Sequence, residues 1–358
     1  MVTYKYGSVE SVVGRVAVYR PEASKGGVRT AAFQLLKGLR KEFQTDEIVA
    51  PSRFRFFDVK FLSRLKQYDV VIYLGSFASV SSVSESFRSI LFLHGILPYE
   101  IKGRLLKASL RERVVAIVDS IWWSVVNMRL VKPDAYICRS VTACELDRLP
   151  REKRVILPQF VLPEEVRLYD RYAPAEIREN VLLAYTSYAF SDRLLPLTVF
   201  LKLVKALSKL VPRPFTVKIM DPHSSPHVYT HGNARVVIQK PLPREEFMRE
   251  LARSTVFFDN CVDEELKYIS VESGLVGTPV AKVVFPQFWG RQVYTGEELL
   301  VAPDFKTLVE RLAECLREPE ECKSRYGAAA NSFVKEKRNW DAVKNDLVKT
   351  IRRFIDNG

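Results

Sequence analysis

The stretch of sequence that decides the fold is DNCVDEELKYISVESGLVGTPVAKVV, residues 259–284. An apolar run just before it, residues 255–258, is typical of a buried parallel strand. A helical stretch follows a polar loop and stops near Gly277, where a C-terminal cap is expected, and Pro279 cannot continue it. Residues 280–284 predict the next strand. Strand, helix and strand in this order indicate an open α/β sheet.

Two carboxylates in this stretch are candidates for ligand binding. Glu264 follows the first strand in a run of acids, and Glu272 lies eight positions later, about two turns along the helix. Ligands of open α/β sheets bind at the carboxyl ends of the strands, where carboxylates accept hydrogen bonds from sugar and ribose hydroxyls. Most such pairs are solvated loop and helix acids, so the pair alone leaves both interpretations open.

The surroundings of the two glutamates resemble a known signature. An acidic loop, Glu264, seven residues, Glu272 and a Gly-Thr-Pro-Val turn at residues 277–280 are similar to the E-x7-E segment of retaining GT-B glycosyltransferases, family 4 in particular. The resemblance implies an α/β fold of GT-B architecture, with two Rossmann-like parallel-sheet domains facing a cleft. It also implies sugar transfer from a nucleotide sugar to a hydroxyl of a glycan, lipid-linked or protein-linked acceptor, with Glu264 holding the donor sugar and Glu272 the ribose.

A glycine pair, Gly26-Gly27, separates an expected strand at residues 14–20 from an expected helix at residues 28–42. Glycines at such a place let the backbone approach a ligand, and the helix N-terminus attracts phosphate. A tight connecting turn explains the pair equally well. A Gly-Gly loop of family 4 faces the donor phosphates at this place, so the resemblance gives that role to Gly26 and Gly27, with Arg29 beside them.

A histidine, His94, closes the strand expected at residues 89–93. A lone histidine is more often structural than catalytic, but this one stands at the carboxyl end of a strand and is followed by glycine. The resemblance implies that its imidazole contacts a hydroxyl of the donor sugar.

The second half of the chain departs from the family pattern at one point. Family 4 holds the donor diphosphate with an arginine and a lysine, and the corresponding positions here are Tyr188 and Arg193. Arg193 is a candidate phosphate ligand or an exposed surface arginine. Lys240 and Leu242 match the loop that faces the nucleotide base in the family.

Three histidines, His223, His227 and His231, stand four residues apart, a spacing that by itself suggests a metal site. Pro222 and Pro226 make a continuous helix improbable there, so a solvated loop is the expected structure. We expect no metal, and no cofactor beyond the nucleotide-sugar co-substrate.

The length of 358 residues suffices for two domains. We expect an acceptor-side domain at residues 1–165, a nucleotide-sugar-binding domain at residues 166–339, and a last helix, residues 340–358, packed back on the first domain. The chain has no apolar run of about 18 residues and no signal-peptide pattern at its start, which favours a cytoplasmic protein, or one attached peripherally to a membrane.

The composition adds two expectations. The five cysteines show no C-x-x-C pair, so buried or reduced thiols are expected. The chain has only eight asparagines and seven glutamines, which hints at a thermophilic source.

The net charge of +13 is concentrated in residues 1–180, which hold 29 basic against 20 acidic side chains. Such an excess suits nucleic acid, anionic lipid or an anionic substrate. Residues 101–130 combine basic side chains with Trp122-Trp123; they form either a helix packed on the sheet or an interfacial helix on an anionic membrane. A nucleotide sugar is the expected partner, and nucleic acid is not expected.

Two rival functions remain open from the sequence. A nucleotide-sugar epimerase uses two similar domains but needs a carboxylate or histidine as a ring base. A non-catalytic basic protein that binds nucleic acid or membrane would account for the charge and for the phenol at Tyr188.

Overall fold

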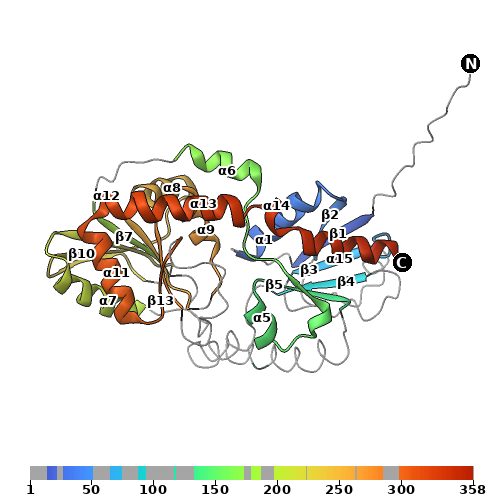
Figure 1. The fold of residues 1–358 in the computed structure, drawn as a ribbon, viewed down its shortest axis with the longest axis horizontal. Coiled ribbons are helices and arrows are strands. Elements are labelled where there is room, and N and C mark those ends of the chain that lie inside the picture. The colour runs from blue at the N-terminus through green and yellow to red at the C-terminus, as the bar shows by residue number, and fades with distance from the viewer. Residues whose placement is uncertain are drawn as a thin grey trace, which may run out of the picture.

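The structure, a computed structural model, describes residues 14–21, 27–50, 65–74, 88–93, 117, 133–172, 179–186, 197–222, 224–262, 264–284 and 298–357. Two sheets with flanking helices stand next to each other along the long axis of the molecule (Figure 1). Among the described strands, every pair but β9–β10 is parallel, as expected for Rossmann-like domains. The predicted α/β fold is therefore confirmed.

The first sheet has the strand order β2-β1-β3-β4-β5-β6. Its strands are β1 (Arg15–Pro21), β2 (Gln44–Ala50), β3 (Val70–Leu74), β4 (Arg88–Phe92), β5 (Ala135–Cys138) and β6 (Arg154–Ile156). Alternate residues of a strand point to opposite faces. Val16 and Val18 of β1 accordingly pack in one cluster, while Ala17 and Tyr19 pack in another.

The second sheet has the order β13-β12-β11-β7-β8-β10-β9. Its strands are β7 (Val181–Tyr185), β8 (Phe215–Met220), β9 (His227–His231), β10 (Ala234–Gln239), β11 (Val256–Asp259), β12 (Val280–Val283) and β13 (Leu300–Ala302). The buried parallel strand expected at residues 255–258 is β11, one residue later than predicted, and all four of its residues are buried.

Helices cover both sheets. They are α1 (Gly27–Leu39), α5 (Val141–Leu146), α6 (Pro163–Asp170), α7 (Leu197–Leu210), α8 (Arg244–Arg253), α9 (Tyr268–Leu275), α11 (Phe305–Arg317), α12 (Pro319–Cys322), α13 (Ala328–Lys337), α14 (Trp340–Val343) and α15 (Asn345–Asp356). Short 3-10 and π turns occupy Arg151–Lys153 and Lys323–Gly327. None of the helices in the described ranges is long and apolar enough to cross a bilayer.

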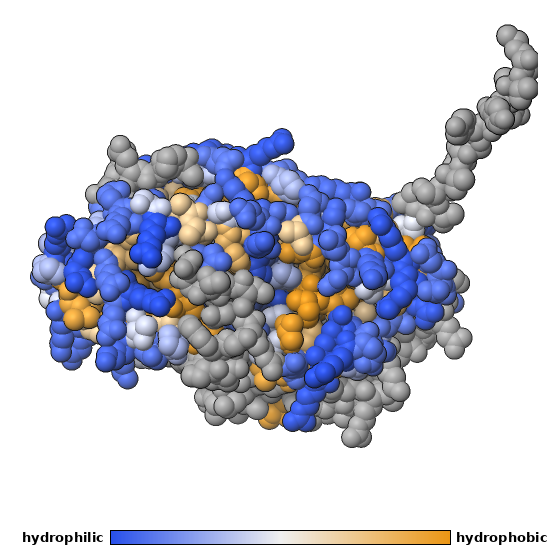
Figure 2. Space-filling model, viewed as in Figure 1, coloured by the Kyte–Doolittle hydropathy of each residue, from blue (hydrophilic) through white to orange (hydrophobic). Residues whose placement is uncertain are grey.

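The C-terminal helices return to the first sheet (Figure 1). Trp340, Leu347 and Ile351 are buried in the same cluster as Leu35 and Leu39 of α1. The outward side of α15 carries basic residues, and hydrophilic residues cover it in Figure 2. The amphipathic pattern of this segment thus explains why it packs on a sheet far away in the sequence.

The loop expected around the three histidines is wrong for His227 and His231, while His223 lies outside the described residues. His227 and His231 are exposed residues of β9, the edge strand, which pairs antiparallel with β10. The two strands are joined by Gly232-Asn233, and Gly232 has a φ of 57°, which only glycine adopts readily. A Gly-Asn pair between two β-prone runs is a hairpin signal, and it accounts for the strand.

The cysteine prediction is also wrong for four of the five side chains. Cys138 is bonded to Cys144 and Cys315 to Cys322, with Cα–Cα distances of 5.7 and 5.0 Å. The first bridge spans the turn from β5 into α5, and the second spans the break between α11 and α12. Chain reversals bring these residues together, so spacing in the sequence does not reveal the pairs. Cys261 is a buried thiol, as expected.

Candidate functional site

Helix α9 presents the predicted ligand-binding face. It ends at Leu275, and Gly277 beyond it has a φ of 71°, which confirms the predicted glycine cap. Gly274 lies against α13, since an added Cβ would stand 2.8 Å from Val334 Cγ2. Side chains two residues apart in an α-helix point about 200° apart around the helix axis. Glu272 therefore leaves α9 on the side away from α13.

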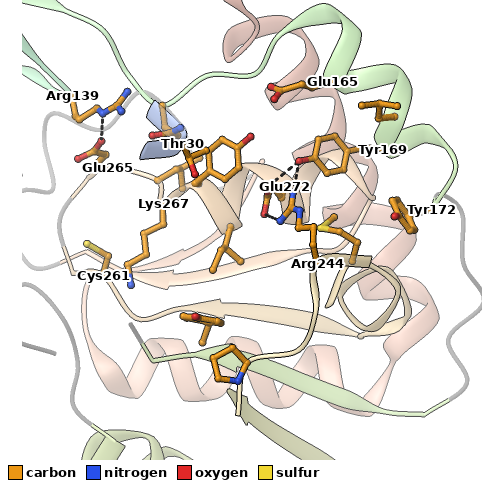
Figure 3. Close-up of a pocket in the computed structure, with 18 of the residues that line it drawn as sticks. Thr30, Arg139, Glu165, Tyr169, Tyr172, Arg244, Cys261, Glu265, Lys267 and Glu272 are labelled. Carbon is orange, nitrogen blue, oxygen red and sulfur yellow. Dashed lines mark hydrogen bonds and ion pairs between the residues drawn. The ribbon is translucent and has the colours of Figure 1, made fainter. Parts of the chain in front are cut away.

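A cavity of about 960 Å³ opens beside this face of α9. Both domains line it, with Thr30, Arg139, Gln159, Glu165, Leu168, Tyr169, Arg171, Tyr172, Tyr185, Pro222, Pro241, Arg244, Met248, Cys261, Glu265, Leu266, Lys267, Tyr268, Ile269 and Glu272. Figure 3 shows Glu272, Arg244 and Tyr169 converging at one end of the cavity, while Arg139 and Glu265 meet at the other.

Glu272 is fully buried and is held by two side chains from other helices. Arg244 Nη1 donates to Glu272 Oε2 over 2.7 Å, and Arg244 Nη2 donates to Oε1. The Tyr169 hydroxyl donates to the same Oε1 over 2.9 Å (Figure 3). Burial raises the pKa of the Glu272 carboxyl, against the lowering effect of Arg244 and Tyr169. The carboxylate and the guanidinium form a two-point ion pair.

Arg244 is the first residue of α8, and half of its side chain is exposed. Its Nη2 also donates to the Tyr169 hydroxyl over 2.5 Å. Burial alone lowers the pKa of Arg244, but the hydrogen bond and charge of Glu272 outweigh it, so the pKa is raised. Burial and the Glu272 charge raise the pKa of Tyr169 as well. Both groups therefore keep their protons near neutral pH.

A second set of hydrogen bonds joins α9 to the first domain. Gln34 of α1 is buried, and its Nε2 donates to the Tyr268 hydroxyl over 2.7 Å and to Glu165 Oε2 over 2.8 Å. Gln159 Nε2 donates to Gln34 Oε1 over 3.3 Å. Burial and the charge of Glu272 raise the pKa of Tyr268. Side chains of α1, α6 and α9 thus meet in one polar cluster beside Glu272.

The other end of the cavity is built from two further charged pairs. Buried Arg139, just after β5, lies 3.6 Å from Glu265 Oε1, and its guanidinium stacks over Phe92 at 4.5 Å. Lys267 Nζ donates to Asn260 Oδ1 and lies 3.9 Å from Asp259 Oδ1. This end also joins the domains, because Arg139 follows β5 of the first sheet and Glu265 follows β11 of the second.

The predicted site residues fall in different places. Glu272 lies in the cavity wall, whereas Glu264 is buried and is not among the lining residues. Lys240 Nζ donates to the Pro222 carbonyl over 2.9 Å, and Leu242 packs on the core, while Pro241 between them faces the cavity. Gly27 is the first residue of α1. Gly26, His94, Tyr188 and Arg193 lie outside the described residues, as do residues 101–130 apart from Ile117.

Polar residues around Glu272 were not predicted: Arg244, Tyr169 and Tyr268 line the cavity, and buried Gln34 donates to Tyr268. No local motif marks them, because Arg244 and Tyr169 stand 28 and 103 residues from Glu272 in the sequence. In the described part of the chain, no group of three or more His, Cys, Asp or Glu side chains is placed to hold a metal ion.

Comparisons with known proteins show the fold. No family model and no curated protein sequence matches the chain. Among solved structures, sucrose-phosphate synthase from Thermosynechococcus elongatus has a TM-score of 0.61 at 14% identity, over 96% of this chain and 100% of that one. The structure of Anabaena HepE in complex with UDP-glucose has a TM-score of 0.59 at 13% identity, over 95% of this chain and 100% of that one. The structure of WaaG, a glycosyltransferase involved in lipopolysaccharide biosynthesis, has a TM-score of 0.56 at 13% identity, over 94% of this chain and 99% of that one. The chain has the GT-B architecture, with two Rossmann-like domains facing a cleft.

Proposed function

We propose that the protein is a glycosyltransferase that moves a sugar from a nucleotide sugar to an acceptor hydroxyl, with retention at the anomeric carbon. The observation that carries this proposal is the position of the cavity. Its lining residues Tyr185, Pro222, Pro241 and Cys261 lie at or just beyond the carboxyl ends of four strands of the second sheet, and Arg139 follows β5 of the first. This is the edge at which open α/β sheets bind ligands.

The structural neighbours support the same ligand class. Two neighbours with this fold are structures of HepE with UDP and with UDP-glucose, and a third neighbour, WaaG, is described as a glycosyltransferase. A cavity of about 960 Å³ lies at the upper end of the size range for small-molecule sites. A nucleoside diphosphate carrying a sugar is therefore the ligand class we assign to it.

The roles of individual residues follow the resemblance described for the sequence. The resemblance assigns contacts with the donor sugar to Glu264 and His94, and contacts with the ribose to Glu272. The resemblance assigns the phosphates to the backbone at Gly26-Gly27 and to Arg193, and the base to the Lys240–Leu242 loop. The leaving diphosphate receives the acceptor proton, so the protein supplies positioning and electrostatic stabilisation, and no metal is needed.

We further propose that residues 101–130 hold the protein reversibly at an anionic membrane, where lipid-linked acceptors are found. Each basic residue near such a surface contributes roughly 1 kcal/mol. Sedimentation with anionic and neutral vesicles tests this, since binding should need anionic lipid and weaken with salt. Protein that stays in the supernatant with anionic vesicles at low salt would contradict it.

Release of free nucleoside diphosphate from a panel of sugar nucleotides tests the proposed function. A transferase releases the diphosphate slowly to water and faster when a suitable acceptor is added. An epimerase converts the sugar and leaves the nucleotide intact, and a non-catalytic protein does neither. Either of the last two results would contradict the proposal.

A further inference from the structure

The wall of the cavity at Glu272 presents a cation rather than a carboxylate. Glu272 has no solvent-exposed surface, although it belongs to the wall. Half of the Arg244 side chain is exposed, and this side chain also lines the cavity. A ligand entering this end therefore meets the guanidinium of Arg244 before it can meet the carboxylate of Glu272.

Arg244 is held firmly in this position. Both of its terminal nitrogens donate to Glu272, and Nη2 donates to Tyr169 as well. A ribose that displaced Arg244 would offer Glu272 neutral hydroxyl donors, and charge-assisted hydrogen bonds are roughly twice as strong as neutral ones. Arg244 is therefore expected to stay on Glu272 when a nucleotide binds.

The guanidinium retains donors for a ligand. It carries five N–H groups. Within the described part of the chain, three of these groups donate hydrogen bonds, two to Glu272 and one to Tyr169. Two N–H groups remain. A guanidinium with two such donors suits oxygen acceptors, and because Glu272 balances its charge, both neutral and anionic oxygens are suitable.

We propose that Arg244, and not Glu272, contacts the nucleotide at this end of the cavity, and that Glu272 and Tyr169 are positioning residues which hold the guanidinium. The ligand is an oxygen acceptor of a nucleoside diphosphate, either of the ribose or of the phosphates. This inference rests on the proposed function, and it changes the role that the family resemblance gives to Glu272.

Calorimetric titration of UDP into the full chain tests the assignment, with Arg244→Met and Arg244→Lys as the variants. Arg249→Met is the matched control, because Arg249 is an exposed arginine of the same helix that does not line the cavity. Arg244→Met should weaken UDP binding at least tenfold, Arg244→Lys should recover only part of the loss, and the control should bind as the wild type does. Equal or tighter binding by folded Arg244→Met would overturn the proposal, because Arg244 would then be a lid over Glu272.

A double variant keeps the test valid if Arg244→Met alone does not fold. Arg244→Met with Glu272→Met replaces the buried ion pair by apolar side chains, a change that folds usually tolerate. Its affinity for UDP should equal that of Arg244→Met, since Glu272 acts through Arg244. The two variants are compared directly if the single variant folds, and otherwise the double variant is compared with the wild type. A double variant that binds UDP as tightly as the wild type, or tenfold more weakly than Arg244→Met, would overturn the proposal.

Uridine and UDP titrations identify the contacted oxygens. Equal weakening of both by Arg244→Met assigns the contact to the ribose, and weakening of UDP alone assigns it to a phosphate; both results support the proposal. Wild-type protein that binds no nucleotide from a panel of nucleoside diphosphates contradicts the proposed function as well. Wild-type binding with no effect of Arg244→Met contradicts only the inference about Arg244.

Discussion

Arg244 and Glu272 form a two-point ion pair across two helices, with Nη1 and Oε2 2.7 Å apart. The Glu272 carboxylate is fully buried, while half of the Arg244 side chain, which lines the cavity, is exposed. Tyr169 adds a hydrogen bond from α6, which lies at the junction of the two domains. The residue that the sequence marks as a ligand-binding acid is thus the centre of a polar cluster between helices.

Replacing Glu272 by alanine should weaken nucleotide binding. The loss of hydrogen bonds to a charged group costs about 1.5–3 kcal/mol, which corresponds to a roughly ten- to hundredfold higher Kd. Calorimetry with UDP measures the change, and Glu246→Ala, at an exposed position of α8, is the control. Unchanged affinity in a folded Glu272→Ala protein would exclude Glu272 from the nucleotide site.

The acid stability of the protein should depend on Asp259. Its carboxylate is buried 3.5 Å from the Nζ of Lys282, which is also buried. Burial by itself raises the pKa of Asp259, but Lys282, Lys267 and the Ser270 hydroxyl outweigh it, so the pKa is lowered. Because the folded pKa lies below the unfolded value of about 3.9, this stabilisation is complete above that pH and is lost as the pH falls through the folded pKa.

Urea unfolding of the wild type and of Asp259→Asn at pH 7 and pH 3 measures this contribution. The free energy of unfolding should fall less between the two pH values in Asp259→Asn than in the wild type. An equal fall in both proteins would show that Asp259 does not carry acid sensitivity. At pH 7, Lys282→Ala should cost about 3–5 kcal/mol, because it leaves a buried carboxylate without its main partner.

Two glycines next to the site should respond differently to substitution. Gly274→Ala places a Cβ 2.8 Å from Val334 Cγ2 and 3.0 Å from the Ala330 carbonyl oxygen, so α13 must shift, at a cost of about 1–3 kcal/mol. Gly277 has open space around it, but its φ of 71° disfavours alanine by about 1–2 kcal/mol.

Chemical denaturation separates the two causes. Gly277→Asn should recover much of the stability lost in Gly277→Ala, because asparagine tolerates a left-handed backbone. Gly274→Asn should be worse than Gly274→Ala, since it adds atoms to an occupied space. A reversal of this order would show that the contact between α9 and α13 is not tight.

Thiol titration of the denatured protein should find one reactive thiol without reductant and five with it. The chain has five cysteines, and four of them form the Cys138–Cys144 and Cys315–Cys322 disulfides. Each bridge closes a short loop and should add about 2 kcal/mol to the free energy of unfolding. Five reactive thiols in unreduced protein would mean that neither bridge forms.

Much of the fold could be predicted from the sequence, because buried parallel strands are short apolar runs and Gly277 marks the end of α9. The hairpin of β9 could have been predicted too, since Gly232-Asn233 is a turn signal. Within the described residues, the sequence pointed to the cavity at Glu272 and at the loop of residues 240–242. Arg244 and Tyr169 reach it from elements that only tertiary packing brings together.

The measurement that decides most directly whether this protein transfers sugars is proton NMR of a reaction with its nucleotide-sugar donor. Sugar nucleotides are screened first for diphosphate release, and the best donor is then followed with an acceptor. The anomeric proton of the product should show the same configuration as the donor, and Glu272→Ala should slow its appearance. Product of inverted configuration, or no product from any donor while the protein remains folded, would contradict retaining glycosyl transfer.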